Sequence, residues 1–65
     1  MPIVRVEIFE GRSIEKKREL VKALTAETVR VLECGEASVN VIIDEVNQEN
    51  WAVGGELYSD RTKRT

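Results

Sequence analysis

A proline directly after the initiator methionine is the residue of this 65-residue chain with the clearest chemical use. Methionine before a small residue is normally trimmed during synthesis, so we expect the mature chain to begin at Pro2. Its secondary amine is then the amino terminus of the protein. An α-amino group has an ordinary pKa of about 7.7–8.0, and burial or a nearby cation lowers that pKa. Because the chain contains no histidine, Pro2 is a candidate general base near neutral pH. Taken alone, Met-Pro equally fits a strand start that needs no N–H.

Arg12 and Trp51 are the next candidates for a site. Arg12 lies in a Gly-Arg-Ser segment directly before an expected helix, where the guanidinium and the helix dipole favour an anionic ligand. A solvated loop arginine is the alternative. Trp51, the single tryptophan, follows polar turn residues and fits either the apolar wall of a pocket or a subunit interface. Cys34 is expected to be a small residue at a helix end, because no base is available to activate its thiol.

Two segments of alternating polarity predict the strands that would position these residues. Residues 2–9 place Val4, Val6 and Ile8 on one face and charged residues on the other, which is typical of a half-buried strand. A second alternating segment, Val39 to Val46, predicts a second strand.

Between the strands the apolar residues recur at helical spacing from Ile14 to about Cys34. Ser13 is a good N-cap, and Gly35 is the expected helix stop. After the second strand, Trp51–Leu57 contains a Gly pair consistent with a small hairpin. The sequence therefore predicts one α/β domain over residues 1–65, a single β-α-β unit with parallel strands, a right-handed crossover and a short C-terminal hairpin.

A chain of this length is marginally stable alone, so something beyond its own core must support it. One cysteine and no histidine nearly exclude disulfides and the usual zinc sites. One helix covers only one face of the sheet, and the other face carries Ile3, Phe9 and Ile42 among polar residues. We therefore expect an oligomer that extends and stacks the sheet.

Composition excludes several classes of function. Ten basic and twelve acidic residues give a net charge of −2, which argues against a nucleic-acid partner. No apolar run approaches the roughly 20 residues that cross a bilayer, so no membrane association is expected. A start interrupted by charges is unlike a signal peptide, and a lone thiol fits a reducing compartment, which together favour a cytoplasmic protein.

Four segments, in this order and spacing, closely resemble the 4-oxalocrotonate tautomerase family: Met1–Ile3, Glu10–Ser13, Ser38–Glu45 and Trp51–Leu57. The resemblance covers essentially the whole chain. It implies a β-α-β subunit, commonly assembled as a homohexamer of three dimers, that uses no cofactor and no metal. It also implies an isomerase that interconverts the enol and keto forms of small unsaturated dicarboxylates such as 2-hydroxymuconate, in bacterial degradation of aromatic compounds.

The resemblance assigns roles to individual residues. Pro2 would take the proton from the 2-hydroxyl group and return it to a carbon further along the conjugated system. Arg12 would bind the carboxylate remote from the enol. Trp51 stands where the family usually has Phe, and would form the apolar wall that lowers the proline pKa and holds the flat diene. Ser38 and Phe9 match pocket-lining positions.

Asn40 departs from the family pattern. Members that act on 2-hydroxymuconate usually have a second arginine there, which binds the enol-end carboxylate and polarises the developing carbonyl from a neighbouring subunit. We therefore expect weaker activity on this dicarboxylate, or a substrate that does not need the second charge. The basic tail offers Arg61, Lys63 and Arg64 as candidate substitutes.

Two alternatives to the tautomerase remain open. One is a hydratase or dehalogenase of the same superfamily that acts on 3-haloacrylate-like acids through a cationic Pro2. It would need a carboxylate to activate water, for which Glu49 is a loose candidate, and related dehalogenases tend to have an arginine where this chain has Phe9. The other is a non-catalytic subunit of a hetero-oligomer whose partner supplies the missing arginine, which retention of Met1 would favour.

Overall fold

The computed structural model describes residues 1–62. Lys63 and Arg64 of the basic tail lie outside the described residues. Along the chain the elements are β1 (Ile3–Phe9), α1 (Ile14–Leu32), the 3-10 turn η1 (Glu36–Ser38), β2 (Asn40–Val46), the 3-10 turn η2 (Gln48–Asn50), β3 (Ala52–Val53), β4 (Glu56–Leu57) and α2 (Tyr58–Thr62).

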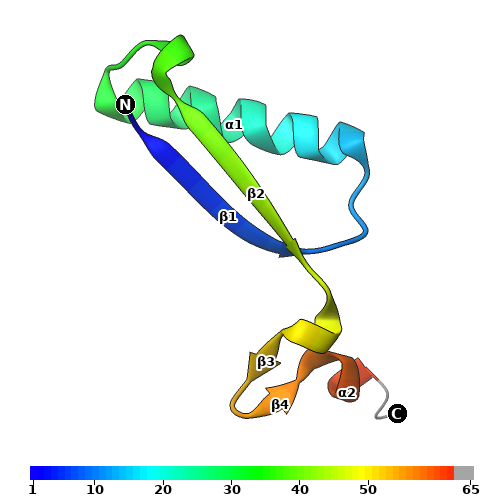
Figure 1. The fold of residues 1–65 in the computed structure, drawn as a ribbon. Helices are drawn as coiled ribbons and strands as arrows, with labels where there is room; N and C mark the ends of the chain where they lie inside the picture. Colours follow the sequence, from blue (N-terminus) through cyan, green and yellow to red (C-terminus); the bar gives the residue numbers. More distant parts are fainter. Residues whose placement is uncertain (63–65) are drawn as a thin grey trace.

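Two parallel strands and one helix form the main body of the molecule. β1 pairs with β2 in register from Ile3 opposite Asn40 to Phe9 opposite Val46. α1 crosses one face of this pair and returns the chain to the start of the sheet (Figure 1). The predicted β-α-β unit with parallel strands is confirmed. α1 lies over the apolar face of β1, so the alternating pattern sets which side of the sheet it covers.

The helix begins where the sequence predicts and ends earlier. The Ser13 hydroxyl accepts a hydrogen bond from the Lys16 N–H at 3.2 Å, which confirms Ser13 as the N-cap. At the other end Glu33 adopts the left-handed conformation, with φ of 53°, and donates its N–H to the Val29 carbonyl at 2.9 Å. Gly35 was expected to stop the helix, which is wrong: its φ is −77°, and the left-handed position is already filled two residues before it.

An ion pair links the first turn of α1 to the end of β2. The Lys17 ammonium lies 2.6 Å from the Glu45 carboxylate, and both side chains are partly shielded, at 24% and 34% exposure. Glu45 lies opposite Ile8 in the strand register. Because solvent still reaches the pair, its contribution to stability is less than about 1 kcal/mol. Its main effect is to fix the helix start over the carboxyl ends of both strands.

Residues 47–62 form a separate C-terminal unit below the β-α-β body (Figure 1). Asn47 starts it, because its side chain accepts the Glu49 N–H and donates to the Glu10 carboxylate, each at 2.8 Å. β3 and β4 then pair antiparallel. Gly54 and Gly55, with φ of 62° and 85°, make the two-residue turn between them, a turn that requires positive φ at both positions. The predicted hairpin is confirmed. The short helix α2 was not predicted.

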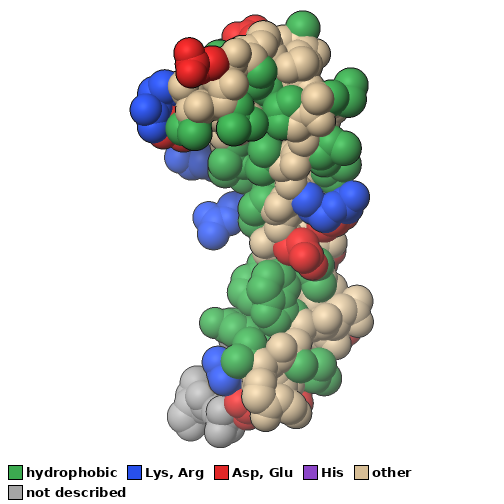
Figure 2. Space-filling view, turned by 90° about the vertical axis from the view of Figure 1, so that its left-hand side faces the viewer, with side chains coloured by type: hydrophobic (Ala, Val, Ile, Leu, Met, Phe, Trp, Pro, Cys, Tyr) green, Lys and Arg blue, Asp and Glu red, His purple; other side chains and the backbone are tan. Residues whose placement is uncertain are grey.

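A single copy does not enclose a core. Over residues 1–62 no side chain is buried, and Ile3, Val31 and Leu32 are each about 60% exposed. The radius of gyration is 15.3 Å, against about 11 Å for a compact domain of this length. Figure 2 shows hydrophobic side chains at the surface of both the upper body and the lower unit. Of the three apolar residues expected on the uncovered face of the sheet, Ile3 and Ile42 are exposed, whereas Phe9 is partly covered by Trp51 and Tyr58.

No helix within residues 1–62 is long and apolar enough to cross a membrane.

Candidate functional site

The predicted site residues lie in two groups at opposite ends of β1. Pro2 precedes this strand and Arg12 follows it. At about 3.3 Å per residue, seven strand residues extend over roughly 20 Å. We call the group Pro2, Ser38 and Asn40 the proline end, and the group Phe9, Arg12 and Trp51 the aromatic end. Within one chain, therefore, the fold does not bring the candidates together.

At the proline end, backbone hydrogen bonds hold Pro2 beside the start of β2. The Pro2 carbonyl accepts the Asn40 N–H at 3.0 Å. The Asn40 side-chain amide turns back to the Ser38 carbonyl at 3.4 Å, a long and weak contact. The Ser38 hydroxyl donates to the Gly35 carbonyl at 2.7 Å. Ser38 and Asn40 are thus neighbours of Pro2, and both side chains bond to nearby backbone.

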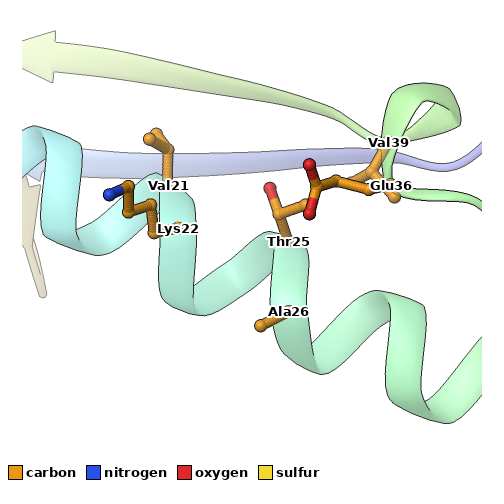
Figure 3. Close-up of a pocket in the computed structure, with 6 residues that line it drawn as sticks. All are labelled: Val21, Lys22, Thr25, Ala26, Glu36 and Val39. Atoms are coloured by element: carbon orange, nitrogen blue, oxygen red, sulfur yellow. The ribbon is translucent and has the colours of Figure 1, made fainter.

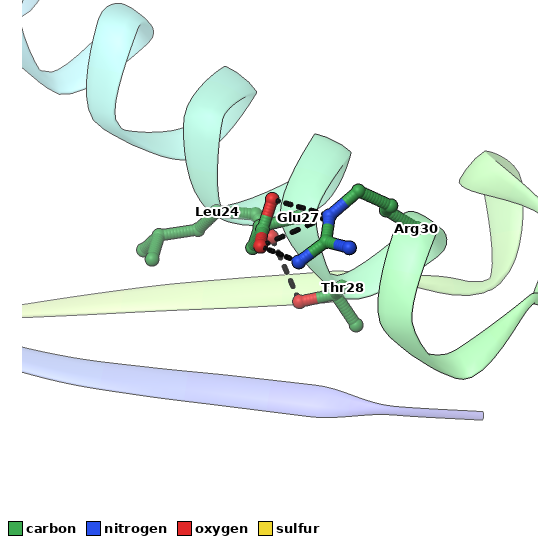
Figure 4. Close-up of polar contacts among 4 residues, drawn as sticks. All are labelled: Leu24, Glu27, Thr28 and Arg30. Carbon is green, nitrogen blue, oxygen red and sulfur yellow. Dashed lines mark hydrogen bonds and ion pairs between the residues drawn. The ribbon is translucent and has the colours of Figure 1, made fainter.

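Pro2 lies on an open, mostly apolar pocket of about 340 Å³ between the start of β1 and the last turns of α1. Its lining comprises Pro2, Ile3, Val4, Glu27, Thr28, Val31 and Leu32. Thr28 donates its hydroxyl to the Leu24 carbonyl at 2.7 Å, so this polar group is satisfied within the helix (Figure 4). Pro2 therefore borders an open surface that is mostly apolar.

The one acidic side chain in this lining is already paired. Both oxygens of the Glu27 carboxylate bond the Arg30 guanidinium one turn along α1 (Figure 4). That contact lowers the pKa of the Glu27 carboxyl below its ordinary value and raises the pKa of Arg30. Glu27 consequently stays ionised and neutralised at neutral pH.

Three aromatic rings cluster at the aromatic end. The Phe9 ring centroid lies 4.4 Å from that of Trp51 at an interplanar angle of 62°. It lies 4.8 Å from that of Tyr58 at 55°. The Tyr58 N–H also donates to the Trp51 carbonyl at 2.7 Å. Phe9 and Trp51 are thus brought together, and Tyr58 is a member of the cluster that sequence reasoning missed. The only indication in the sequence was that Tyr58 is an aromatic residue directly after the predicted hairpin.

Arg12 lies on a separate small cavity of about 220 Å³ at the start of α1. The cavity is lined by Ile8, Arg12, Lys16, Lys17 and Leu20. Lys17 is paired with Glu45, whereas the Arg12 guanidinium makes no hydrogen bond or ion pair with any residue from 1 to 62. An unpaired guanidinium beside two further cations provides a site for a carboxylate.

A third and larger hollow, of about 530 Å³, lies between α1 and the segment that enters β2 (Figure 3). Its lining comprises Val21, Lys22, Thr25, Ala26, Glu36 and Val39. None of the predicted site residues belongs to it. Among residues 1–62, no group of three or more Cys, Asp or Glu side chains is arranged to hold a metal ion.

Comparison with known proteins identifies close relatives of this arrangement. A family model described as "Tautomerase enzyme" matches residues 2–61. The 2-hydroxymuconate tautomerase of Pseudomonas putida is 41% identical over 59 residues, which cover 91% of this chain and 94% of that protein.

Solved structures of similar fold come from the same family. A 4-oxalocrotonate tautomerase isozyme from Methylibium petroleiphilum superposes with a TM-score of 0.95 at 33% identity, over 98% of this chain and 100% of the other. A heterohexamer 4-oxalocrotonate tautomerase from Chloroflexus aurantiacus gives 0.87 at 38% identity, over 92% and 97%. The similarity thus includes the C-terminal unit as well as the β-α-β body.

Proposed function

This chain is a tautomerase of the 4-oxalocrotonate tautomerase family, and on that premise we propose that it isomerises a small unsaturated dicarboxylate of the 2-hydroxymuconate type with Pro2 as the general base. The observation that carries the proposal is the apolar pocket on which Pro2 lies. Once Met1 is removed, the Pro2 nitrogen is a secondary amine in surroundings that favour its neutral form.

The neutral amine of Pro2 accepts the proton of the substrate's 2-hydroxyl group. As that O–H bond breaks, its electron pair forms the carbonyl and the conjugated double bonds shift along the chain. The protonated amine then returns its proton to a carbon further along the system. The overall change is an isomerisation, with no net gain or loss of protons or electrons. The base is regenerated in each cycle.

Arg12 binds the carboxylate remote from the enol. Its guanidinium is unpaired within residues 1–62, so it is available for a bidentate contact. Because β1 separates Arg12 from Pro2 by roughly 20 Å, the Arg12 that serves a given Pro2 belongs to another copy of the chain. The site is therefore formed where the aromatic end of one copy meets the proline end of another.

Phe9 and Trp51 form the apolar wall that excludes water and holds the flat diene. Asn40, beside Pro2, offers the developing carbonyl one neutral donor. Its amide is only weakly engaged by the Ser38 carbonyl, so it is free to turn to a substrate. A neutral amide polarises a carbonyl less than a guanidinium does. We expect slower turnover than in relatives that have arginine at this position.

The test is ketonisation of 2-hydroxymuconate, followed by ultraviolet absorbance, with protein whose mass confirms loss of Met1. Replacing a general base costs about 10²–10⁴-fold in rate, and we expect a loss in that range for Pro2→Ala. Lys22→Ala, in the hollow that contains no site residue, is the matched control and should retain the wild-type rate. Undiminished turnover in Pro2→Ala would refute the assignment of the base.

One observation favours a second possibility. The relative from Chloroflexus aurantiacus is a heterohexamer, so a partner chain that supplies the missing cation is a specific alternative for this subunit. Native mass spectrometry of the purified protein separates the two cases. A single subunit mass supports the homo-oligomer, and a stable second chain supports the hetero-oligomer.

A further inference from the structure

A substrate with two carboxylates needs two cationic partners, and the described site residues supply one. Arg12 is charged, whereas Asn40 is neutral and offers only an amide donor, which makes a weak contact with the Ser38 carbonyl. If the protein is a homo-oligomer, the second cation comes from another residue of this chain. The aromatic end contains a suitable one.

Arg61 is held in place on the aromatic cluster. Its Nε donates to the Glu56 carboxylate at 3.0 Å, and its guanidinium carbon lies 5.4 Å from the centroid of the Tyr58 ring. The side chain is 40% exposed, so it remains accessible to a ligand. A guanidinium has five N–H donors, more than one carboxylate occupies. Because Glu56 and Tyr58 fix its orientation, Arg61 loses less side-chain freedom on binding than an unsupported arginine does.

The same contacts connect Arg61 to the apolar wall. Tyr58 packs against Phe9, and Phe9 packs against Trp51. The guanidinium thus packs on the Tyr58 ring, which adjoins the surface of Phe9 and Trp51 against which the flat substrate is proposed to lie. An exposed cation at the edge of an apolar wall is suited to bind the charged end of a molecule whose middle is apolar.

We propose that Arg61 binds the second carboxylate of the substrate, in the role that the neutral Asn40 does not fill. The inference rests on the proposed function, since it concerns the same site. It makes Arg61 a specificity-determining residue that favours dicarboxylates over monocarboxylates. It also gives Glu56 and Tyr58 a positioning role.

Trp51 allows binding to be measured without turnover, because it is the single tryptophan of the chain and lies in the cluster. Its fluorescence is recorded during titration with adipate and with hexanoate, unreactive six-carbon acids with two carboxylates and one. Wild type should bind adipate more tightly. In Arg61→Gln the dissociation constant for adipate should rise about tenfold or more, as expected for the loss of a charged hydrogen bond. The constant for hexanoate should change much less.

Arg18→Gln is the matched control, since Arg18 lies on the exposed side of α1 outside both groups of site residues. It removes the same charge and should leave the ratio of the two dissociation constants unchanged. Arg61→Lys, which keeps the charge, should restore part of the preference and shows that the effect does not come from misfolding. Ionic strength is held constant throughout.

The inference is overturned if Arg61→Gln retains the wild-type ratio, if Arg18→Gln lowers it equally, or if wild type shows no preference for adipate. Because the titration needs no turnover, its result is independent of the ketonisation test. A wild type that binds adipate through Arg61 but does not ketonise 2-hydroxymuconate would refute the proposed reaction alone. An active enzyme with an unaffected Arg61→Gln variant would refute this inference alone.

Discussion

Among single residues, Pro2 has surroundings consistent with the role proposed for it. It lies on an apolar pocket whose one acid, Glu27, is neutralised by Arg30. No free carboxylate of that lining stabilises a protonated amine. An apolar environment without a counter-ion lowers the pKa of an amine. On the proposed mechanism, this lining favours the form of Pro2 that accepts a proton.

This gives a pH dependence with a definite sign. Below the pKa of the Pro2 nitrogen the amine is protonated and inactive, so kcat/KM for ketonisation should rise with pH and then level off. The inflection should lie below the ordinary α-amino value of about 7.7–8.0. A pH–rate profile of kcat/KM measures it. A rate that falls with rising pH through this region would indicate a cationic Pro2, as the hydratase alternative requires.

At the residue level, the sequence suggested candidates for the site but few of their contacts. Pro2, Arg12 and Trp51 stood out by type and by place in the chain. Tyr58 did not, because its place in the cluster depends on ring packing with Phe9, about fifty positions away. The position of Arg61 did not either, because it depends on the side-chain orientations of Glu56 and Tyr58, which the sequence pattern does not show. Such contacts are tertiary and leave no periodic signal.

Among the elements, the end of α1 shows how local sequence misleads. Glycine is the residue that adopts positive φ without steric cost, so Gly35 was the obvious stop. The structure instead places Glu33 there, with φ of 53°. A side chain in this conformation is disfavoured by roughly 1–2 kcal/mol. The helix therefore ends at Leu32, with Glu33 as its C-cap.

Glu33→Gly should therefore stabilise the protein. Relief of the left-handed conformation outweighs the added freedom of the unfolded chain, for a net gain of about 1 kcal/mol or less. Denaturant unfolding at fixed protein concentration measures it.

Gly35→Ala is the matched control. Gly35 has an ordinary φ, and a Cβ there meets no atom within 4 Å, so this variant should not be destabilised. A large loss of stability in Gly35→Ala with no gain in Glu33→Gly would show that Gly35 is the true helix stop.

The other elements followed from their patterns. Alternation predicted β1 and β2 almost to their bounds, and the Gly pair predicted the turn between β3 and β4. α2 was missed because five residues are too few to show a helical period.

For the whole molecule, the placement of the candidate residues at the two ends of β1 allows the proposed shared site to be tested by mixing. Pro2→Ala copies and Arg12→Ala copies should each be inactive alone. Mixed under conditions that allow subunit exchange, they should regain part of the wild-type ketonisation rate, because some sites then combine an intact Pro2 with an intact Arg12. A site formed within one chain predicts no recovery, since every copy has one defect. Mixing either variant with more of itself is the control.

The absence of a buried side chain in residues 1–62 has a consequence for how this enzyme responds to dilution. On the proposed assembly, a copy gains a closed core and a complete site only on association, which depends on concentration by mass action. Structure and activity should then disappear over the same range of dilution, with no range in which folded but inactive single copies accumulate. For such a protein, the amount present in a cell would set the activity of each copy as well as the number of copies.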